Sequence, residues 1–172
     1  MRSAIVVALF TAASSFAVVT PFSLKDMKSG EIYNSANHPG SVFLLESYFL
    51  NCPYCNDNAP NVDSVANFFE SEGRVQVLDV GVDRSDAQYA EWIRRHHPNH
   101  PVLNDGARTL TRKLGTSNYP TSYVVDSSGN ILLRTVGVWS ESTKARILQT
   151  ISNALAQMDE DESEHGACLQ AP

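Results

Sequence analysis

The hydrophobic pattern of the chain contains a near-continuous apolar stretch from Val42 to Leu50. Such a stretch lacks the alternation of a half-exposed strand, so it predicts a central parallel strand that is covered on both faces. Val75–Val82 predicts a second strand and Val102–Leu103 a short one. Two further runs, Thr121–Val125 and Ile131–Val136, flank a turn-rich link that ends in Gly-Asn. Together these two runs predict a hairpin.

Between the strands, apolar residues return at helical spacing. The first predicted helix covers residues 53–72 and contains Pro60, and Ser85 is placed to cap a second one. A short helix is expected over Ala107–Leu114, and a last helix begins at about Glu141. Its apolar positions, spaced for packing on a sheet, are Ile147, Ile151, Leu155 and Met158.

This order of elements predicts an α/β protein with a central mixed sheet and helices on both faces. The polar, turn-rich segment from Pro21 to Gly40 is expected to form a hairpin or loop at its edge. In α/β folds the chemistry lies beyond the carboxyl ends of the parallel strands. The residues that directly follow Leu50 are therefore the first candidates for a site.

Both ends of the chain differ in composition from its centre. Residues 1–17 combine a short basic start, an apolar core and small residues, which is the pattern of a secretory signal peptide. We expect a single domain over residues 18–158 and a disordered acidic tail over residues 159–172. The mature chain is then exported, to the periplasm or outside a bacterial cell or to the endoplasmic reticulum lumen, without a stable membrane span.

Charge excludes one class of partner. The formal net charge is −6 and no basic stripe is visible, so we expect no nucleic acid partner. The length of 172 residues suits one domain with a full core, and we expect a monomer.

The candidate chemistry lies in the sequence Asn-Cys-Pro-Tyr-Cys at positions 51–55. Two cysteines three residues apart on a first helical turn lie on one face and can form a disulfide. Pro53 suits that turn because its missing N–H costs nothing there. The amides and positive dipole end of the helix favour the thiolate of Cys52, which makes it the attacking nucleophile, and Cys55 then resolves the mixed disulfide.

Other readings of the same cysteines remain open. A structural disulfide between residues three apart closes too short a loop to stabilise a fold much. A zinc site would need His165 and Cys168 as its other ligands, and haem attachment would need a histidine at position 56, which is Asn. We therefore expect no metal and no cofactor. The residues His96, His97 and His100 lie in a proline-rich turn, so we expect them to be solvent-exposed.

Over roughly residues 22–156 the chain resembles the thioredoxin superfamily, in its exported TlpA-like oxidoreductase branch. The resemblance rests on the Cys-Pro-Tyr-Cys motif, Pro60 five residues after it, the sequence Tyr119-Pro120-Thr121, and Gly129 and Gly137. The more distant peroxiredoxins place Pro and Thr or Ser where this chain has Leu45 and Phe49, so their peroxidatic motif is absent.

The resemblance implies roles for further residues. Pro120 is expected to be a cis-proline opposite the dithiol, with Tyr119, Pro53 and Tyr54 also in the substrate-binding surface. Glu46, six residues before Cys52, is implied as the proton acceptor for Cys55. Two residues depart from the branch, which usually has Glu at the position of Asn58 and Trp at that of Asn51.

The predicted function is therefore thiol-disulfide exchange with protein substrates and with a redox partner protein. The alternatives are a non-catalytic peptide-binding module that has a structural disulfide, and a small zinc-binding domain.

Overall fold

The computed structural model describes residues 18–19 and 21–168. The predicted signal peptide, residues 1–17, lies outside the described residues. Within the described part of the chain, the strands form one seven-stranded sheet in the order β2-β1-β5-β4-β3-β6-β7. Their bounds are β1 (Ser23–Asp26), β2 (Ile32–Asn34), β3 (Val42–Tyr48), β4 (Val75–Gly81), β5 (Val102–Asn104), β6 (Thr121–Val125) and β7 (Ile131–Val136).

The sheet is mixed. β3, β4 and β5 are parallel, whereas β6 and β7 add an antiparallel hairpin on one side. On the other side β1 and β2 form an antiparallel hairpin that pairs with β5, as one of the two forms expected for residues 21–40. β3 is buried along its whole length because both of its faces are covered, as its uninterrupted apolar pattern predicts.

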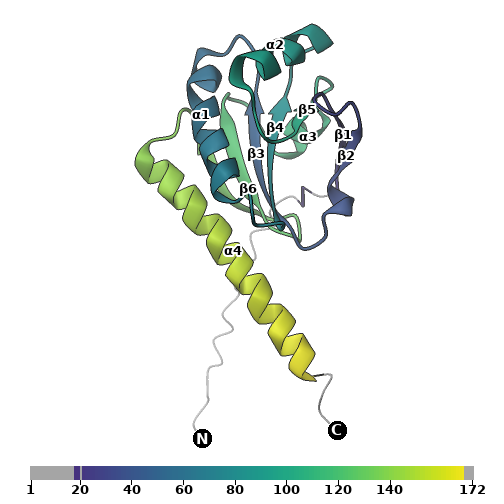
Figure 1. The fold of residues 1–172 in the computed structure, drawn as a ribbon, viewed down its shortest axis with the longest axis vertical. Helices are drawn as coiled ribbons and strands as arrows, with labels where there is room; N and C mark the ends of the chain where they lie inside the picture. The colour runs from purple at the N-terminus through teal and green to yellow at the C-terminus, as the bar shows by residue number, and fades with distance from the viewer. Residues whose placement is uncertain (1–17, 20, 169–172) are drawn as a thin grey trace, which may run out of the picture.

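The helices are α1 (Pro53–Phe68), α2 (Asp86–His96), α3 (Thr109–Lys113) and α4 (Glu141–Cys168), with a short 3-10 helix, η1 (Ser35–Asn37), before β3. α1 and α4 pack on one face of the sheet through Val62, Val65, Ile147 and Ile151. The other face is covered by α3 and the first described residues, through Leu110 and Phe22. The predicted fold class, a mixed sheet with helices on both faces, is confirmed (Figure 1).

Helix ends differ from the prediction at several points. α1 ends at Phe68, four residues before the expected end, and α3 is shorter than expected. The start of α2, in contrast, agrees with the prediction. Ser85 is its N-cap, and a capping box with Gln88 closes the first turn.

The largest difference concerns α4, which continues to Cys168 through the segment that we expected to be disordered. Residues 159–168 continue the helix that packs on the sheet. The first turn of a helix is the unfavourable one to form, and here the packed part of α4 already supplies it, so the following residues can extend the helix. Arg74 Nη1 also lies 2.6 Å from Asp159 Oδ1, in a partly solvent-exposed ion pair between this part of the helix and the domain. The far end of α4 projects beyond the sheet (Figure 1). None of the described helices has the length and apolarity needed to cross a membrane.

Candidate active site

The two cysteines lie where the chain turns from β3 into α1. Cys52 is the N-cap of α1, and Pro53 occupies the first turn. Cys52 and Cys55 form a disulfide, with their Cα atoms 5.2 Å apart. The Sγ of Cys52 accepts a hydrogen bond from the backbone N–H of Cys55 at 3.1 Å. The same N–H and the helix dipole favour a thiolate at this sulfur in the reduced protein.

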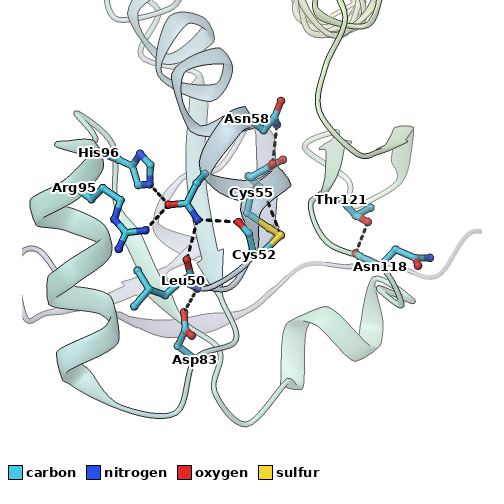
Figure 2. The surroundings of a disulfide bond; sticks show 11 residues. Leu50, Cys52, Cys55, Asn58, Asp83, Arg95, His96, Asn118 and Thr121 are labelled. Carbon is cyan, nitrogen blue, oxygen red and sulfur yellow. Dashed lines mark hydrogen bonds between the residues drawn. A yellow bond between two sulfur atoms is a disulfide. The ribbon is translucent and has the colours of Figure 1, made fainter.

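The loop before α1 is held by two polar side chains. Asp83 Oδ2 accepts a hydrogen bond from the N–H of Leu50 at 2.9 Å. Asn56 donates its Nδ2 to the carbonyls of Leu50 and Cys52, each at 2.8 Å. Its Oδ1 accepts from Arg95 Nη1 at 2.8 Å, and His96 Nε2 lies 2.9 Å away. Figure 2 shows Arg95 and His96 reaching from α2 toward this loop.

The segment before β6 lies on the other side of the disulfide. The Tyr119–Pro120 peptide bond is cis, as expected. The carbonyl of Pro120 accepts a hydrogen bond from Gly137 N at 2.9 Å, and Thr121 Oγ1 donates to the carbonyl of Asn118 at 2.7 Å. Figure 2 shows Asn118 and Thr121 across the disulfide from α2.

The surface around the dithiol combines apolar and basic side chains. Tyr54 is 65% exposed, whereas Cys52 and Cys55 are 3% and 2% exposed. The ring of Tyr119 packs edge-on against Phe49, with centroids 5.5 Å apart. Beside these two rings is a groove of about 310 Å³ whose other lining residues are Val82, Asp83, Arg84, Gln88 and Arg108. Neither cysteine lines this groove, but Phe49 and Tyr119 pack against the buried cluster that contains Cys52 and Cys55.

Glu46 lies in the middle of β3 and is only 2% exposed. Asn58 Nδ2 donates to its Oε1 at 2.8 Å, and the Ser122 hydroxyl donates to Oε2. Burial raises the pKa of Glu46 to about 8, although these two hydrogen bonds favour the charged form and lower it. A carboxyl group that titrates near neutral pH suits general-base work.

Sequence reasoning missed the residues that hold Glu46. Asn58 is fully buried, and its Oδ1 accepts the backbone N–H of Trp139 at 2.8 Å. Trp139 Nε1 donates to Ser122 Oγ at 2.7 Å. In the sequence, Asn58 stands out only because it departs from the Glu that is usual at this position. Its position three residues after Cys55, on the same helix face, is the signal that could have placed it in the site.

The expectation that all three histidines are solvent-exposed is wrong for two of them. His97 is exposed, but His96 is half-buried and His100 is only 6% exposed. His100 Nε2 lies 3.3 Å from Asp79 Oδ1, and its Nδ1 lies 3.4 Å from Asp63 Oδ1. The prolines correctly predict the loop after α2. The carboxyl groups that offset the cost of burying His100, however, belong to Asp63 of α1 and Asp79 of β4, which are distant in the sequence.

Within the described residues, no cluster of His, Cys, Asp and Glu side chains is suited to a metal ion. The zinc hypothesis also requires His165 and Cys168, which belong to the last turns of α4. Figure 1 shows that this end of α4 projects away from the start of α1.

A Cys-x-x-Cys disulfide at the start of a helix, with a cis-proline directly before the neighbouring strand, defines a thioredoxin-like protein. The chain belongs to the AhpC/TSA family, which matches residues 17–134. This result agrees with the resemblance to the TlpA-like branch of the thioredoxin superfamily.

Individual relatives are distant in sequence but similar in fold. The chain is 23% identical over 121 residues to the thiol-disulfide oxidoreductase ResA of Bacillus subtilis, covering 70% of this chain and 66% of ResA. ResA of Bacillus thuringiensis is 20% identical over 108 residues, 63% of this chain and 60% of the relative. The match therefore spans less than two thirds of these curated relatives.

Solved structures match over more of the chain. The exposed lipoprotein thioredoxin Etrx1 of Streptococcus pneumoniae superimposes with a TM-score of 0.67 and 26% identity, covering 78% of this chain and 99% of Etrx1. A thiol:disulfide interchange protein of Chlorobium tepidum superimposes with a TM-score of 0.69 and 23% identity, covering 84% of this chain and 99% of that one.

Proposed function

We propose that this protein is a thiol-disulfide oxidoreductase that exchanges disulfides with protein substrates through Cys52 and Cys55. The observation that carries the proposal is the disulfide at the start of α1, with Cys52 at the N-cap and a cis-proline opposite. A purely structural disulfide would not need its first cysteine at a helix N-terminus.

In the reducing direction, the thiolate of Cys52 attacks one sulfur of a substrate disulfide. The substrate S–S bond breaks, and its electron pair leaves on the second substrate sulfur, which takes a proton from solvent. Cys55 then gives its proton to Glu46 and attacks the sulfur of Cys52. The mixed disulfide breaks, and the substrate leaves as a thiolate that is then protonated. The substrate has gained two electrons and is a dithiol, while Cys52 and Cys55 have lost two electrons and form a disulfide. The same steps in reverse oxidise a substrate dithiol.

Substrate binding is assigned to the surface around the dithiol. The exposed Pro53 and Tyr54 lie between the cysteines, and Tyr119 and Pro120 stand in the chain between Asn118 and Thr121, which Figure 2 shows across the disulfide from α2. We propose that an incoming extended segment pairs with the backbone of Tyr119 as a strand does. We further propose that the mature protein acts as an exported monomer, in the periplasm or outside the cell, and exchanges electrons with a partner protein there.

Two cysteine variants test the proposal. Cys52→Ser is expected to abolish reduction of a disulfide-bonded reporter protein. Cys55→Ser is expected to accumulate a mixed disulfide through Cys52, seen as a shifted band on a non-reducing gel. Cys168→Ser is the matched control and is expected to behave as wild type.

The proposal is contradicted if the wild-type protein binds a peptide but neither reduces a disulfide nor oxidises a dithiol in any substrate tested. Binding that survives Cys52→Ser would then assign the peptide-binding module. One zinc ion per purified chain, lost in Cys168→Ser, would assign the zinc-binding domain.

A further inference from the structure

A second buried carboxyl group lies directly beside Glu46. The register of β3 and β4 pairs Glu46 with Asp79, so the two side chains project from the same face of the sheet, under α1. Asp79 is 3% exposed, and Glu46 is 2% exposed. Two adjacent carboxyl groups at this depth disfavour each other's ionisation, unless something compensates one of them.

Asp79 has its own set of partners, separate from those of Glu46. Trp92 Nε1 donates to its Oδ2 at 2.8 Å. Its Oδ1 lies 3.3 Å from His100 Nε2, and the other ring nitrogen of His100 lies 3.4 Å from Asp63 Oδ1. His100 is therefore enclosed between a carboxyl group from β4 and one from α1.

The rest of the fold holds this pair in place. Lys28, in the turn after β1, donates its Nζ to the carbonyls of Pro98 at 2.5 Å and of His100 at 3.0 Å. The indole of Trp92 is stacked on Tyr48, with centroids 3.9 Å apart. Because both the loop and the helix are fixed, Asp79 and His100 keep one arrangement next to Glu46.

The charges of this cluster are coupled. Burial lowers the pKa of His100, whereas Asp79 and Asp63 raise it. The effect of the two carboxyl groups prevails, so the pKa of His100 lies above its ordinary value. For Glu46, after burial and its hydrogen bonds, a negative Asp79 raises the pKa and a positive His100 lowers it. Five other titratable groups lie near Asp79 and His100. They are Asp63 and Cys55 of α1, His96 of α2, Tyr48 of β3, and Lys28.

We propose that Asp79 and His100 form a positioning pair that sets how readily Glu46 accepts the proton of Cys55. When His100 is protonated, it compensates Asp79, and Glu46 can hold a negative charge. When His100 is neutral or absent, Asp79 faces Glu46 alone, and Glu46 keeps its proton to higher pH. This inference rests on the proposed role of Glu46 as proton acceptor.

The test follows resolution of a mixed disulfide by Cys55 as a function of pH. Reduced protein is mixed with DTNB in a stopped-flow instrument. Attack by Cys52 releases the first nitrothiobenzoate, and attack by Cys55 on the mixed disulfide releases the second. The pH midpoint of the second phase reports the group that accepts the Cys55 proton.

Two variants are expected to move that midpoint in opposite directions. Asp79→Asn removes the negative charge beside Glu46 and should lower the midpoint by about one pH unit, while an amide can still accept from Trp92. His100→Asn removes the compensating charge and should raise the midpoint by a similar amount. His97→Asn, on the same loop but exposed, is the matched control and should leave the midpoint unchanged.

The outcomes separate the two claims. If Glu46→Gln leaves the second-phase midpoint in place, the proposed role of Glu46 is wrong. If Glu46→Gln removes it but neither Asp79→Asn nor His100→Asn shifts it more than the control, the positioning pair is overturned. Should His100→Asn unfold, ¹³C NMR titration of the Glu46 carboxyl group in wild type and Asp79→Asn decides the question, because an unshifted Glu46 in Asp79→Asn contradicts the pair.

Discussion

Glu46 shows how a single buried carboxyl group can be tolerated in a mostly apolar strand. Each of its carboxyl oxygens accepts one hydrogen bond, from Asn58 and from Ser122. Both donors are themselves held by Trp139, through its backbone N–H and its indole. These contacts reduce the cost of burying the carboxyl group, but the raised pKa shows that they do not cancel it.

The pKa of Glu46 predicts a specific dependence of stability on pH. The folded pKa, about 8, lies above the ordinary value of 4.5, so the folded protein binds this proton more tightly than the unfolded chain. The resulting stabilisation is complete below about pH 4.5 and is lost as the pH rises through about 8. Gln cannot titrate, so Glu46→Gln should lack a loss on the order of 4 kcal/mol across this window.

Urea unfolding of wild type and Glu46→Gln at pH 5, 7 and 9 measures this difference. Glu70→Gln, at an exposed position just after the end of α1, is the control and should follow the wild-type curve at each pH. Parallel curves for wild type and Glu46→Gln would contradict the raised pKa.

At the scale of elements, the start of α1 is joined to α2 by one amide. Asn56 uses its Nδ2 for two carbonyls of the active-site loop, while its Oδ1 faces Arg95 and His96 of α2. α2 belongs to the segment between β4 and β5, so this segment supports the dithiol in addition to covering the sheet.

We therefore expect Asn56→Ala to loosen the active-site loop. The loss of its hydrogen bonds should lower the free energy of unfolding by about 1–2 kcal/mol. It should also increase amide hydrogen exchange at Cys52 and Tyr54. Urea unfolding and exchange mass spectrometry measure the two effects.

Asn153→Ala makes the same change on the exposed face of α4, where the side chain bonds only Gln149 among the contacts found. This control is expected to stay within about 0.5 kcal/mol of wild type. Equal effects of the two substitutions would show that Asn56 does not hold the loop.

At the scale of the whole molecule, α4 contributes to the domain mainly through its first half. Ile147, Ile151 and Leu155 are buried against the sheet, whereas residues 160–163 are exposed. The ion pair of Asp159 with Arg74 is partly solvent-exposed, so it adds little stability.

Removal of residues 162–172 should consequently leave the domain folded. We expect the free energy of unfolding to change by less than about 1 kcal/mol, since the described apolar side chains that α4 packs on the sheet all lie before residue 159. The helical signal in circular dichroism should fall, because residues 162–168 are helical in the full chain. Disulfide exchange with a reporter protein should be unchanged. A chain that fails to fold would show that the far end of α4 supports the domain.

The sequence by itself determined the order of the elements and the place of the dithiol. The apolar run of β3 predicted a fully covered strand, and the spacing of Cys52, Pro53 and Cys55 predicted a disulfide on a first helical turn. These properties are local, because they depend on residues that are near each other along the chain. The cis bond before Pro120 was expected only through resemblance to a family.

The tertiary structure alone decided what surrounds Glu46. Asp79 and Ser122 flank it because β4 and β6 pair with β3 in one particular register. A shift of one residue would turn these side chains to the other face, and no local pattern specifies that register. His100 looked like a turn residue in the sequence, and only the approach of Asp63 and Asp79 buries it. The dithiol could thus be found from spacing, whereas the groups that tune its proton transfer exist only once distant segments meet.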